Sequence, residues 1–134
     1  MIWSPLAQGY LSGKFREGQD AGDTRLALSK RLAGADNDRA RAVVDVVAAI
    51  GDAHSVSPAQ VALAWLLRRP GVTSVILGAR SDEQLIDNLA AAALKLSDEE
   101  MARLDTVSQT TSPYPDSYFR MFASERNPPI FPRY

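Results

Sequence analysis

The strongest pattern along the chain is an apolar stripe at helical spacing between residues 38 and 53. Four apolar residues recur there three or four positions apart: Val43, Val46, Val47 and Ile50. This spacing puts side chains on one face of a helix. We therefore expect a helix over 38–53, with Gly51 near its end, where helix breakers concentrate.

A second helix is marked at its start. Ser57 is a candidate N-cap, Pro58 stands at the first helical position, and Gln60 completes a capping box. Val56 and Val61 flank that start as a hydrophobic staple. The residues that follow are apolar nearly all round, so we expect a buried helix that ends at the Arg-Arg-Pro-Gly sequence.

Residues 73–77 form a short β-branched run, which is typical of a buried parallel strand. Ser81 then caps a helix that has Gln84 at its third position. We expect the inner face of this helix to consist of four apolar residues: Leu85, Ile86, Leu89 and Ala93.

A further capping box is formed by Ser97 and Glu100, with Leu96 and Met101 as its staple. It starts a helix whose inner face we expect to be Leu104 and Val107. The single histidine, His54, falls at the end of an expected helix, and we interpret it as a C-terminal charge or a surface residue.

Two segments lack such periodicity. Residues 16–37 predict a long loop, a kind of segment that is often functional. Residues 110–134 hold five of the eight prolines and predict an irregular tail. The order of strand, loop, two helices, strand, two helices and tail is an α/β pattern. We expect one partial domain over 1–134, with parts 1–37, 38–109 and 110–134.

Composition narrows the class of protein. The 134 residues include 15 Lys+Arg and 16 Asp+Glu, for a net charge of -1. This balance argues against a nucleic-acid partner or an anionic membrane, and against a DNA-binding unit over 38–68. The longest apolar run is too short to span a bilayer. The start has no secretory pattern, so we expect a cytoplasmic protein. No cysteine or metal-ligand cluster suggests a metal.

A glycine and an arginine follow the expected strand at 73–77. Gly78 would let a ligand approach the backbone closely, and the helix start after it offers unpaired N–H groups. Arg80 adds a charged fork for phosphate oxygens. Gln84 and Asn88, four residues apart on one helix face, could bond a purine or a ribose. An ordinary turn, a capping glutamine and a solvated arginine are the alternative.

The segment at 3–14 has a similar character. Ser4 and Pro5 follow an apolar strand, and two glycines make the loop tight. The Ser4 hydroxyl could donate to a pyrophosphate, and Lys14 could supply a point charge. An ordinary Ser/Gly/Pro loop with a solvated lysine is the alternative.

Several segments together resemble aldo-keto reductases. Residues 3–14 (Trp-Ser-Pro-Leu-Ala-Gln-Gly-Tyr-Leu-Ser-Gly-Lys) resemble the loop after the seventh strand of that family, and 75–88 the loop and helix after the eighth. Residues 57–67 are similar to its penultimate barrel helix, and 113–115 and 126–129 to its C-terminal ending. The resemblance implies a C-terminal fragment of a TIM (β/α)8 barrel, with two parallel strands, helices and an irregular tail.

The resemblance also implies a binding site for NADP(H). By position, Trp3 would stack on the nicotinamide ring, and Ser4 and Leu6 would hold the pyrophosphate region. Lys14 and Arg25 would belong to the loop that folds over the cofactor. The remaining implied contacts are with the adenosine end: Gly78 and Arg80 at the 2′-phosphate, and Gln84, Asp87 and Asn88 at the adenine. An arginine at the 2′-phosphate favours NADP over NAD.

The family's catalytic tyrosine, lysine, aspartate and histidine come from the first half of the barrel, so the resemblance assigns no catalytic residue here. We expect the NADP(H)-binding C-terminal part of an aldo-keto reductase, whose parent reaction is NADPH-dependent carbonyl reduction or alcohol oxidation of a small substrate. We do not expect catalysis by this part alone. The alternative is a non-catalytic cofactor-sensing or interaction subunit, as found on ion channels.

A closed barrel of this type takes about 250 residues, and two strands cannot close one. We therefore expect the chain alone to be marginally folded, assembled with other copies, or a truncated gene product. A part of a longer protein is the alternative. We also expect open strand edges, through which the chain would self-associate.

Overall fold

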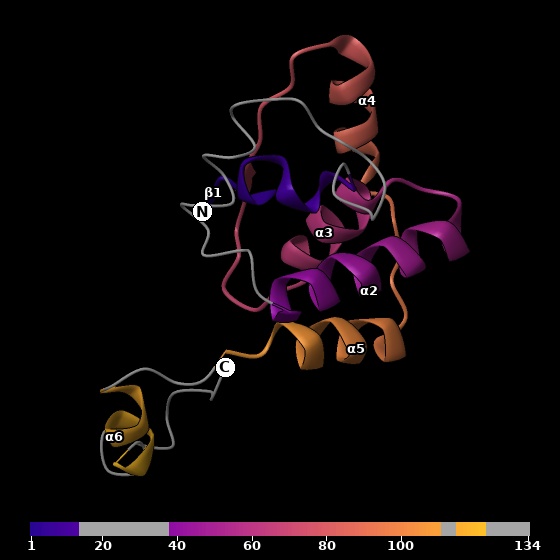
Figure 1. Ribbon diagram of the computed structural model, residues 1–134. Coiled ribbons are helices and arrows are strands. Elements are labelled where there is room, and N and C mark those ends of the chain that lie inside the picture. Colours follow the sequence, from indigo (N-terminus) through magenta and orange to yellow (C-terminus); the bar gives the residue numbers. More distant parts are fainter. Residues whose placement is uncertain (14–37, 111–114, 123–134) are drawn as a thin grey trace.

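The computed structural model describes residues 1–13, 38–110 and 115–122 (Figure 1). The loop expected over 16–37 lies outside these residues, as do Lys14 and Arg25. The elements are β1 (Ile2–Trp3), the 3-10 helix η1 (Ala7–Ser12), α2 (Asp38–His54), α3 (Pro58–Leu67), β2 (Val75–Ile76), α4 (Asp82–Ala90), α5 (Asp98–Ser108) and α6 (Asp116–Met121).

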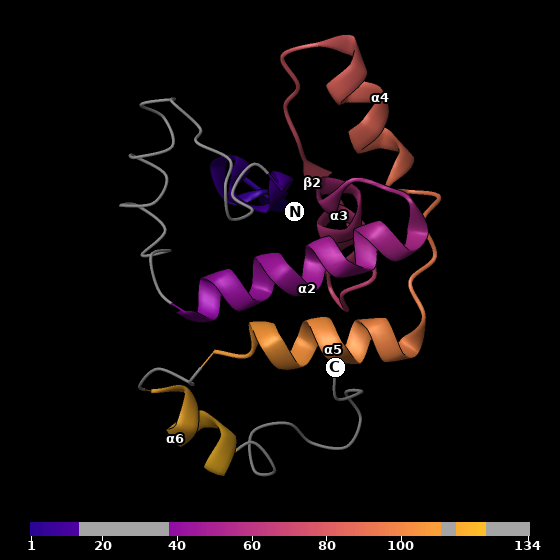
Figure 2. The same ribbon diagram turned by 45° about the vertical axis from the view of Figure 1, so that its right-hand side comes forward.

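Helices α2, α3 and α5 enclose the main core, and α2 runs alongside α5 in both ribbon views (Figure 2). The stripe predicted on the first helix is confirmed. Val47 and Ile50 are buried in the core, and Val43 and Val46 pack against it. The rest of the buried cluster comes from α3 and α5 and from the residue before α5: Val61, Ala62, Ala64, Leu104 and Leu96.

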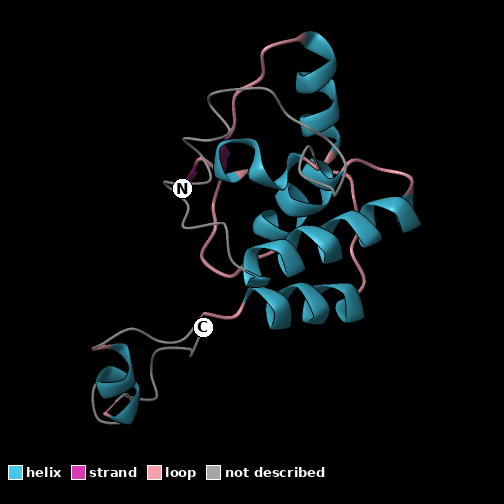
Figure 3. Cartoon of the chain, in the orientation of Figure 1, coloured by secondary structure: helices cyan, strands magenta, loops and turns pink. Residues whose placement is uncertain are grey.

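The two strands are parallel and pair with each other, with Ile2 opposite Val75 and Trp3 opposite Ile76. Figure 3 shows how small this sheet is beside the helices that the structure describes. The second strand is shorter than the expected run at 73–77. Two parallel strands with several helices confirm a mixed α/β fold, and this arrangement is consistent with a piece of a barrel.

The corner between α2 and α3 closes as a Schellman motif. The N–H of Val56 donates to the Gly51 carbonyl at 2.9 Å, and the N–H of Ser55 donates to that of Asp52 at 3.2 Å. Ser55 has a φ of 55°, in the left-handed region that favours glycine. Gly51 itself is buried, and a Cβ there would lie 2.9 Å from the Val56 carbonyl oxygen. Gly51 therefore allows the close approach, and Ser55 makes the turn.

The N-cap of α3 is confirmed, but its predicted capping box is wrong. The Ser57 hydroxyl accepts from the Gln60 N–H at 3.2 Å. The Gln60 side chain does not return to the cap backbone, because its Nε2 donates to Asp87 on α4 at 2.6 Å. The Gln60 side chain thus bonds a residue 27 positions later in the chain instead of the backbone of the nearby cap residue.

The orientation of α4 contradicts the expected inner face. Leu85, Ile86 and Leu89 are 41%, 68% and 58% exposed, whereas Asn88 is only 7% exposed. Asn88 and the following Ala91 are buried instead, because α4 turns its polar and small residues toward α3. No other described segment covers the leucine-rich face.

The capping box of α5 is confirmed. Ser97 accepts from the Glu100 N–H at 3.1 Å, and Glu100 Oε2 accepts from the Ser97 N–H at 2.7 Å. The other Glu100 oxygen lies 2.7 Å from His54 Nε2 at the end of α2. His54 thus joins a helix C-terminus to a helix N-terminus. The expected staple is present as well, with Leu96 buried and Met101 packed against the core.

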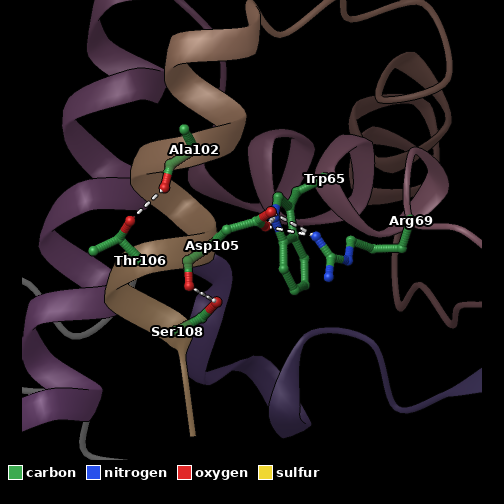
Figure 4. Close-up of polar contacts among 6 residues, drawn as sticks. All are labelled: Trp65, Arg69, Ala102, Asp105, Thr106 and Ser108. Atoms are coloured by element: carbon green, nitrogen blue, oxygen red, sulfur yellow. Dashed lines mark hydrogen bonds and ion pairs between the residues drawn. The ribbon is translucent and has the colours of Figure 1, made fainter. Parts of the chain in front are cut away.

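A three-residue polar contact fastens α3 to α5 (Figure 4). Asp105 accepts from the Trp65 indole at 2.8 Å and from Arg69 at 2.7 Å through both of its oxygens. The Arg69 guanidinium lies 5.0 Å from the Trp65 ring centre, a cation–π distance. The three side chains therefore fix one another and the angle between the two helices.

The tail is less irregular than expected, because Asp116–Met121 forms a short helix, α6. The rings of Tyr118 and Phe122, four positions apart, lie 4.8 Å from each other and so support this turn. Among the described residues, no helix has the length and apolar character needed to cross a membrane.

At the corner between α2 and α3, substitutions of two small residues should change the stability of the fold in opposite directions. Gly51→Ala should destabilise the fold by about 1–3 kcal/mol, because the new methyl group would press on a backbone oxygen. Ser55→Gly should stabilise it by roughly 0.5–1 kcal/mol, because glycine adopts the left-handed conformation freely. Urea unfolding of both variants checks this, and destabilisation by Ser55→Gly would contradict the assigned turn.

Glu100 should contribute a pH-dependent part of the stability. The Ser97 N–H lowers the pKa of Glu100 from its ordinary value of 4.5, and the contact with His54 adds to this. A lowered folded pKa means that the contribution is present above pH 4.5 and is lost as the pH falls through the folded value. Glu100→Gln should therefore cost about 0.5–1 kcal/mol at pH 7 and progressively less toward pH 3. Glu99→Gln is the matched control, and a cost independent of pH would contradict the assignment.

Self-association through open strand edges stays a prediction. Besides those edges, the strand pair exposes Trp3 and Ile76, and α4 exposes an apolar face of its own. Sedimentation velocity over a range of protein concentrations should show a mass that rises with concentration. A constant monomer mass would contradict the prediction.

Candidate functional site

The segments that follow the two strands emerge at the same end of the sheet. Because β1 and β2 are parallel and in register, Ser4 and Leu77 both begin loops at the carboxyl edge. Ligands of α/β sheets bind at this edge, where loops from neighbouring strands converge. The structure thus brings the two predicted loops to one edge.

The loop after β1 holds an unusual amount of backbone strain. Ser4, Ala7 and Gln8 have φ values of 52°, 47° and 58°, although none of them is glycine. Such conformations cost about 1 kcal/mol or more each, and they cluster at binding sites. The loop is held by its own hydrogen bonds, from the Ala7 N–H to the Ser4 carbonyl at 3.0 Å and from the Gly9 N–H to the Leu6 carbonyl at 2.9 Å.

The three predicted contacts in this loop are placed differently. Trp3 is 79% exposed, so its indole ring has a free face. Ser4 is half-buried at the strained turn. Leu6 is half-buried and packs against the main core, so its side chain anchors the loop.

The loop after β2 is open. A Cβ built on Gly78 would meet nothing within 4 Å, so the backbone there is accessible to a ligand. Arg80 is exposed, and its guanidinium makes no ion pair with another described residue. The Arg80 N–H donates to Gln84 Oε1 at 3.0 Å. This bond leaves the amide NH2 group of Gln84 to donate elsewhere.

The charges at the start of α4 are mixed. The helix N-terminus and Arg80 attract anions, but Asp82 and Glu83 stand in the first turn. The Ser81 hydroxyl lowers the pKa of Glu83, so this carboxylate is charged at neutral pH. Binding of a phosphate here therefore depends on Arg80 rather than on the helix end alone.

Asp87 and Asn88 lie on the α3 side of α4. Asp87 accepts from Ser57 Oγ and from Gln60 Nε2, both at 2.6 Å. Asn88 is buried beside it. The family resemblance implied that Asp87, like Gln84 and Asn88, contacts the adenine. The structure shows that the Asp87 carboxylate already has two donors from the protein.

The sequence did not predict that the start of α3 belongs to this region. It fastens α4 through Ser57 and Gln60, and it also supports the loop after β1, because a Cβ on Gly13 would lie only 2.8 Å from Pro58 Cγ. Gly13 has a φ of +82° and ends η1 against this proline. The sequence signal at 57–60 was present, but it indicated only a helix start.

Comparisons with known proteins agree on one family. The family model described as "Aldo/keto reductase family" matches residues 1–109. The chain is 36% identical over 122 residues to "Probable voltage-gated potassium channel subunit beta" of Oryza sativa subsp. japonica, covering 87% of this chain and 37% of that protein. It is 33% identical over 116 residues to "Protein tas" of Escherichia coli K12, covering 86% and 34%.

A third relative is matched along almost the whole chain. The chain is 32% identical over 138 residues to "Aldo-keto reductase str7" of Strobilurus tenacellus, covering 99% of this chain and 40% of that protein. The chain therefore spans 34–40% of the length of these three relatives. The matched model extends from β1 to the end of α5, and on this basis the chain belongs to the aldo/keto reductase family.

Proposed function

We propose that this chain is the NADP(H)-binding C-terminal part of an aldo/keto reductase barrel. The observation that carries the proposal is the parallel pairing of β1 and β2, which sends the loops at 4–13 and 77–81 to one edge. The exposed indole of Trp3 directly precedes the first loop, and the exposed Arg80 lies within the second. In chemistry, the indole suits the flat nicotinamide ring at one end of a dinucleotide, and the guanidinium suits the phosphate at its adenosine end.

The donor set fits such a cofactor. The free face of Trp3 offers a stacking surface for a flat ring. Ser4 brings a hydroxyl, and the open backbone at Gly78 allows close approach of a phosphate. When bound, the nicotinamide would supply the hydride that reduces a carbonyl in the parent reaction. The described residues of this chain bind and orient the cofactor.

A preference for NADP over NAD follows from Arg80. A guanidinium without another described ion-pair partner can engage a 2′-phosphate through two parallel hydrogen bonds. Glu83 lies in the first turn of α4, three positions after Arg80, and repels that phosphate. The two residues therefore act on the 2′-phosphate with opposite sign, and a cofactor without this phosphate would be indifferent to both.

We expect no carbonyl turnover by this chain alone. A catalytic tyrosine must reach the substrate oxygen with its hydroxyl. Of the described tyrosines, Tyr10 lies on η1 but is only 7% exposed, packed against Val44, and Tyr118 lies on α6. Neither is assigned as a proton donor to a substrate. The parent substrate is proposed only as a small carbonyl compound.

A cofactor-sensing or interaction subunit is the second candidate. The rice relative, named "Probable voltage-gated potassium channel subunit beta", favours it, because its identity to this chain is 36%, against 32% and 33% for the relatives named as reductase and tas. Both candidates need the same cofactor site. Carbonyl turnover on reconstitution with the first part of an aldo/keto reductase barrel would favour the reductase, and cofactor binding without turnover would favour the subunit.

An NADPH titration followed by tryptophan fluorescence tests the proposed site. We expect saturable quenching that disappears in Trp3→Phe, since Trp65 is held between helices. Arg80→Ala should weaken NADPH binding about tenfold, a loss equivalent to one charged phosphate contact, and Glu83→Gln should strengthen it. Neither change should alter binding of NADH.

Arg103→Ala, which removes an arginine from α5, is the matched control and should leave NADPH affinity unchanged. Absence of saturable quenching in the wild-type chain would contradict the proposal. Equal losses of NADPH and NADH affinity in Arg80→Ala would contradict the assigned 2′-phosphate contact.

A further inference from the structure

The loop after β1 is attached to the rest of the structure at both of its ends. At its start, β1 pairs with β2. At its end, Gly13 lies against the first turn of α3. Between these ends, Leu6 and Leu11 pack against the main core, and η1 contacts both α2 and α3. The loop is thus held by the sheet, by the core and by α3.

Gly13 meets α3 so closely that a side chain on it does not fit. Its φ is +82°, in the left-handed region that glycine adopts freely. A Cβ at this position would lie 2.8 Å from Pro58 Cγ and 3.4 Å from Pro58 Cδ. Carbon atoms in contact prefer a separation of about 3.5–4.0 Å. A side chain on residue 13 would therefore push the end of η1 away from α3.

Pro58 has little freedom to yield to such a side chain. Its ring is closed on its own backbone nitrogen, so it cannot rotate aside as an open side chain would. Pro58 directly follows the cap residue Ser57, whose hydroxyl accepts from the Gln60 N–H. The Pro58 nitrogen also lies 3.4 Å from the place of a Cβ on buried Gly51. The loop, rather than the helix, is therefore the part that would move.

The loop is strained, so its shape depends on these attachments. Left-handed φ values occur at three of its residues that are not glycine: Ser4, Ala7 and Gln8. Such conformations persist only where the surrounding structure holds them. The Ser12 hydroxyl donates to the Gly9 carbonyl at 2.7 Å, which ties the residue before Gly13 to the residue after this strained stretch. A displacement at Gly13 would therefore be passed back along the loop.

We propose that Gly13 is a positioning residue for the nicotinamide half of the cofactor site. It allows the loop after β1 to lie against Pro58, and it acts on the cofactor through that loop rather than by contact. This inference rests on the proposed function, because Trp3 and Ser4 belong to the proposed site. It adds Gly13 and Pro58, to which the family resemblance gave no role in binding.

A rescue experiment in the full chain tests this role. Gly13→Ala adds the clash with Pro58 and puts alanine in a left-handed conformation. Pro58→Ala removes Cγ and Cδ and leaves only a Cβ, which lies at an ordinary contact distance of 3.5 Å. The double variant Gly13→Ala/Pro58→Ala therefore keeps the strain and loses the clash. Gly71→Ala is the matched control, because Gly71 has a φ of +80° and a Cβ there would meet nothing within 4 Å.

Two ligands separate the halves of the site, with affinities measured by NMR titration. NADPH spans both loops, whereas adenosine 2′-phosphate lacks the pyrophosphate and the nicotinamide. We expect Gly13→Ala to bind NADPH about tenfold more weakly, as it would with the loop correctly placed in about one molecule in ten. Its affinity for adenosine 2′-phosphate should stay unchanged. A merely structural role would weaken both ligands alike.

The rescue should restore the loop and the affinity together. In the double variant, NADPH affinity should return to within about threefold of wild type. Amide hydrogen exchange over 6–13 should be faster in Gly13→Ala and should recover in the double variant. Gly71→Ala should leave the affinity for both ligands unchanged. Should Gly13→Ala fail to fold, the double variant should still fold and bind NADPH.

Three results would overturn the inference. Equal losses for the two ligands in Gly13→Ala would mean that Gly13 supports the fold as a whole. A double variant that binds NADPH no better than Gly13→Ala would exclude the contact with Pro58 as the cause. Unchanged exchange over 6–13 in Gly13→Ala would show, independently of any cofactor, that Gly13 does not position the loop. A wild-type chain that binds neither ligand would instead contradict the proposed function.

Discussion

The first turn of α3 holds both the loop after β1 and helix α4 in place. Its cap residue, Ser57, directly follows the corner between α2 and α3, and Pro58 lies against the end of η1 at Gly13. Ser57 and Gln60 hold α4 through Asp87. The buried side of the same helix fills the core between α2 and α5. Both candidate cofactor segments are therefore attached to one turn of helix, and a shift of that turn would move both.

The polarity of α4 shows what this attachment does. Its polar and small residues face α3, while Leu85, Ile86 and Leu89 face outward. Hydrophobicity alone would turn these three residues toward the core, since full burial of each side chain is worth about 1.5–3 kcal/mol. The orientation is consistent with a family barrel in which further elements lie beside this helix, and the chain spans 34–40% of the length of the three relatives compared.

Local signals in the sequence predicted local structure well. The stripe at 43–50, the N-caps at Ser57, Ser81 and Ser97, and the capping box of α5 are all confirmed, because each depends on residues within one or two turns. Two of the errors concern partners far along the chain. Gln60 was assigned to a local cap but bonds Asp87, and the face of α4 was inferred from hydrophobicity without knowledge of that bond. In the site, Trp3, Ser4 and the 78–84 loop could be proposed from the motifs, whereas their meeting at one edge depended on the strand pairing.

In the proposed site, the loops after the two strands form one cofactor surface. A two-dimensional ¹H–¹⁵N NMR titration of the full chain with NADPH tests this. We expect the amide shifts to concentrate in residues 3–13 and 77–88 and to leave α5 unchanged, with both segments responding at the same NADPH concentration. Shifts confined to one of the two segments, or centred on α5, would contradict it.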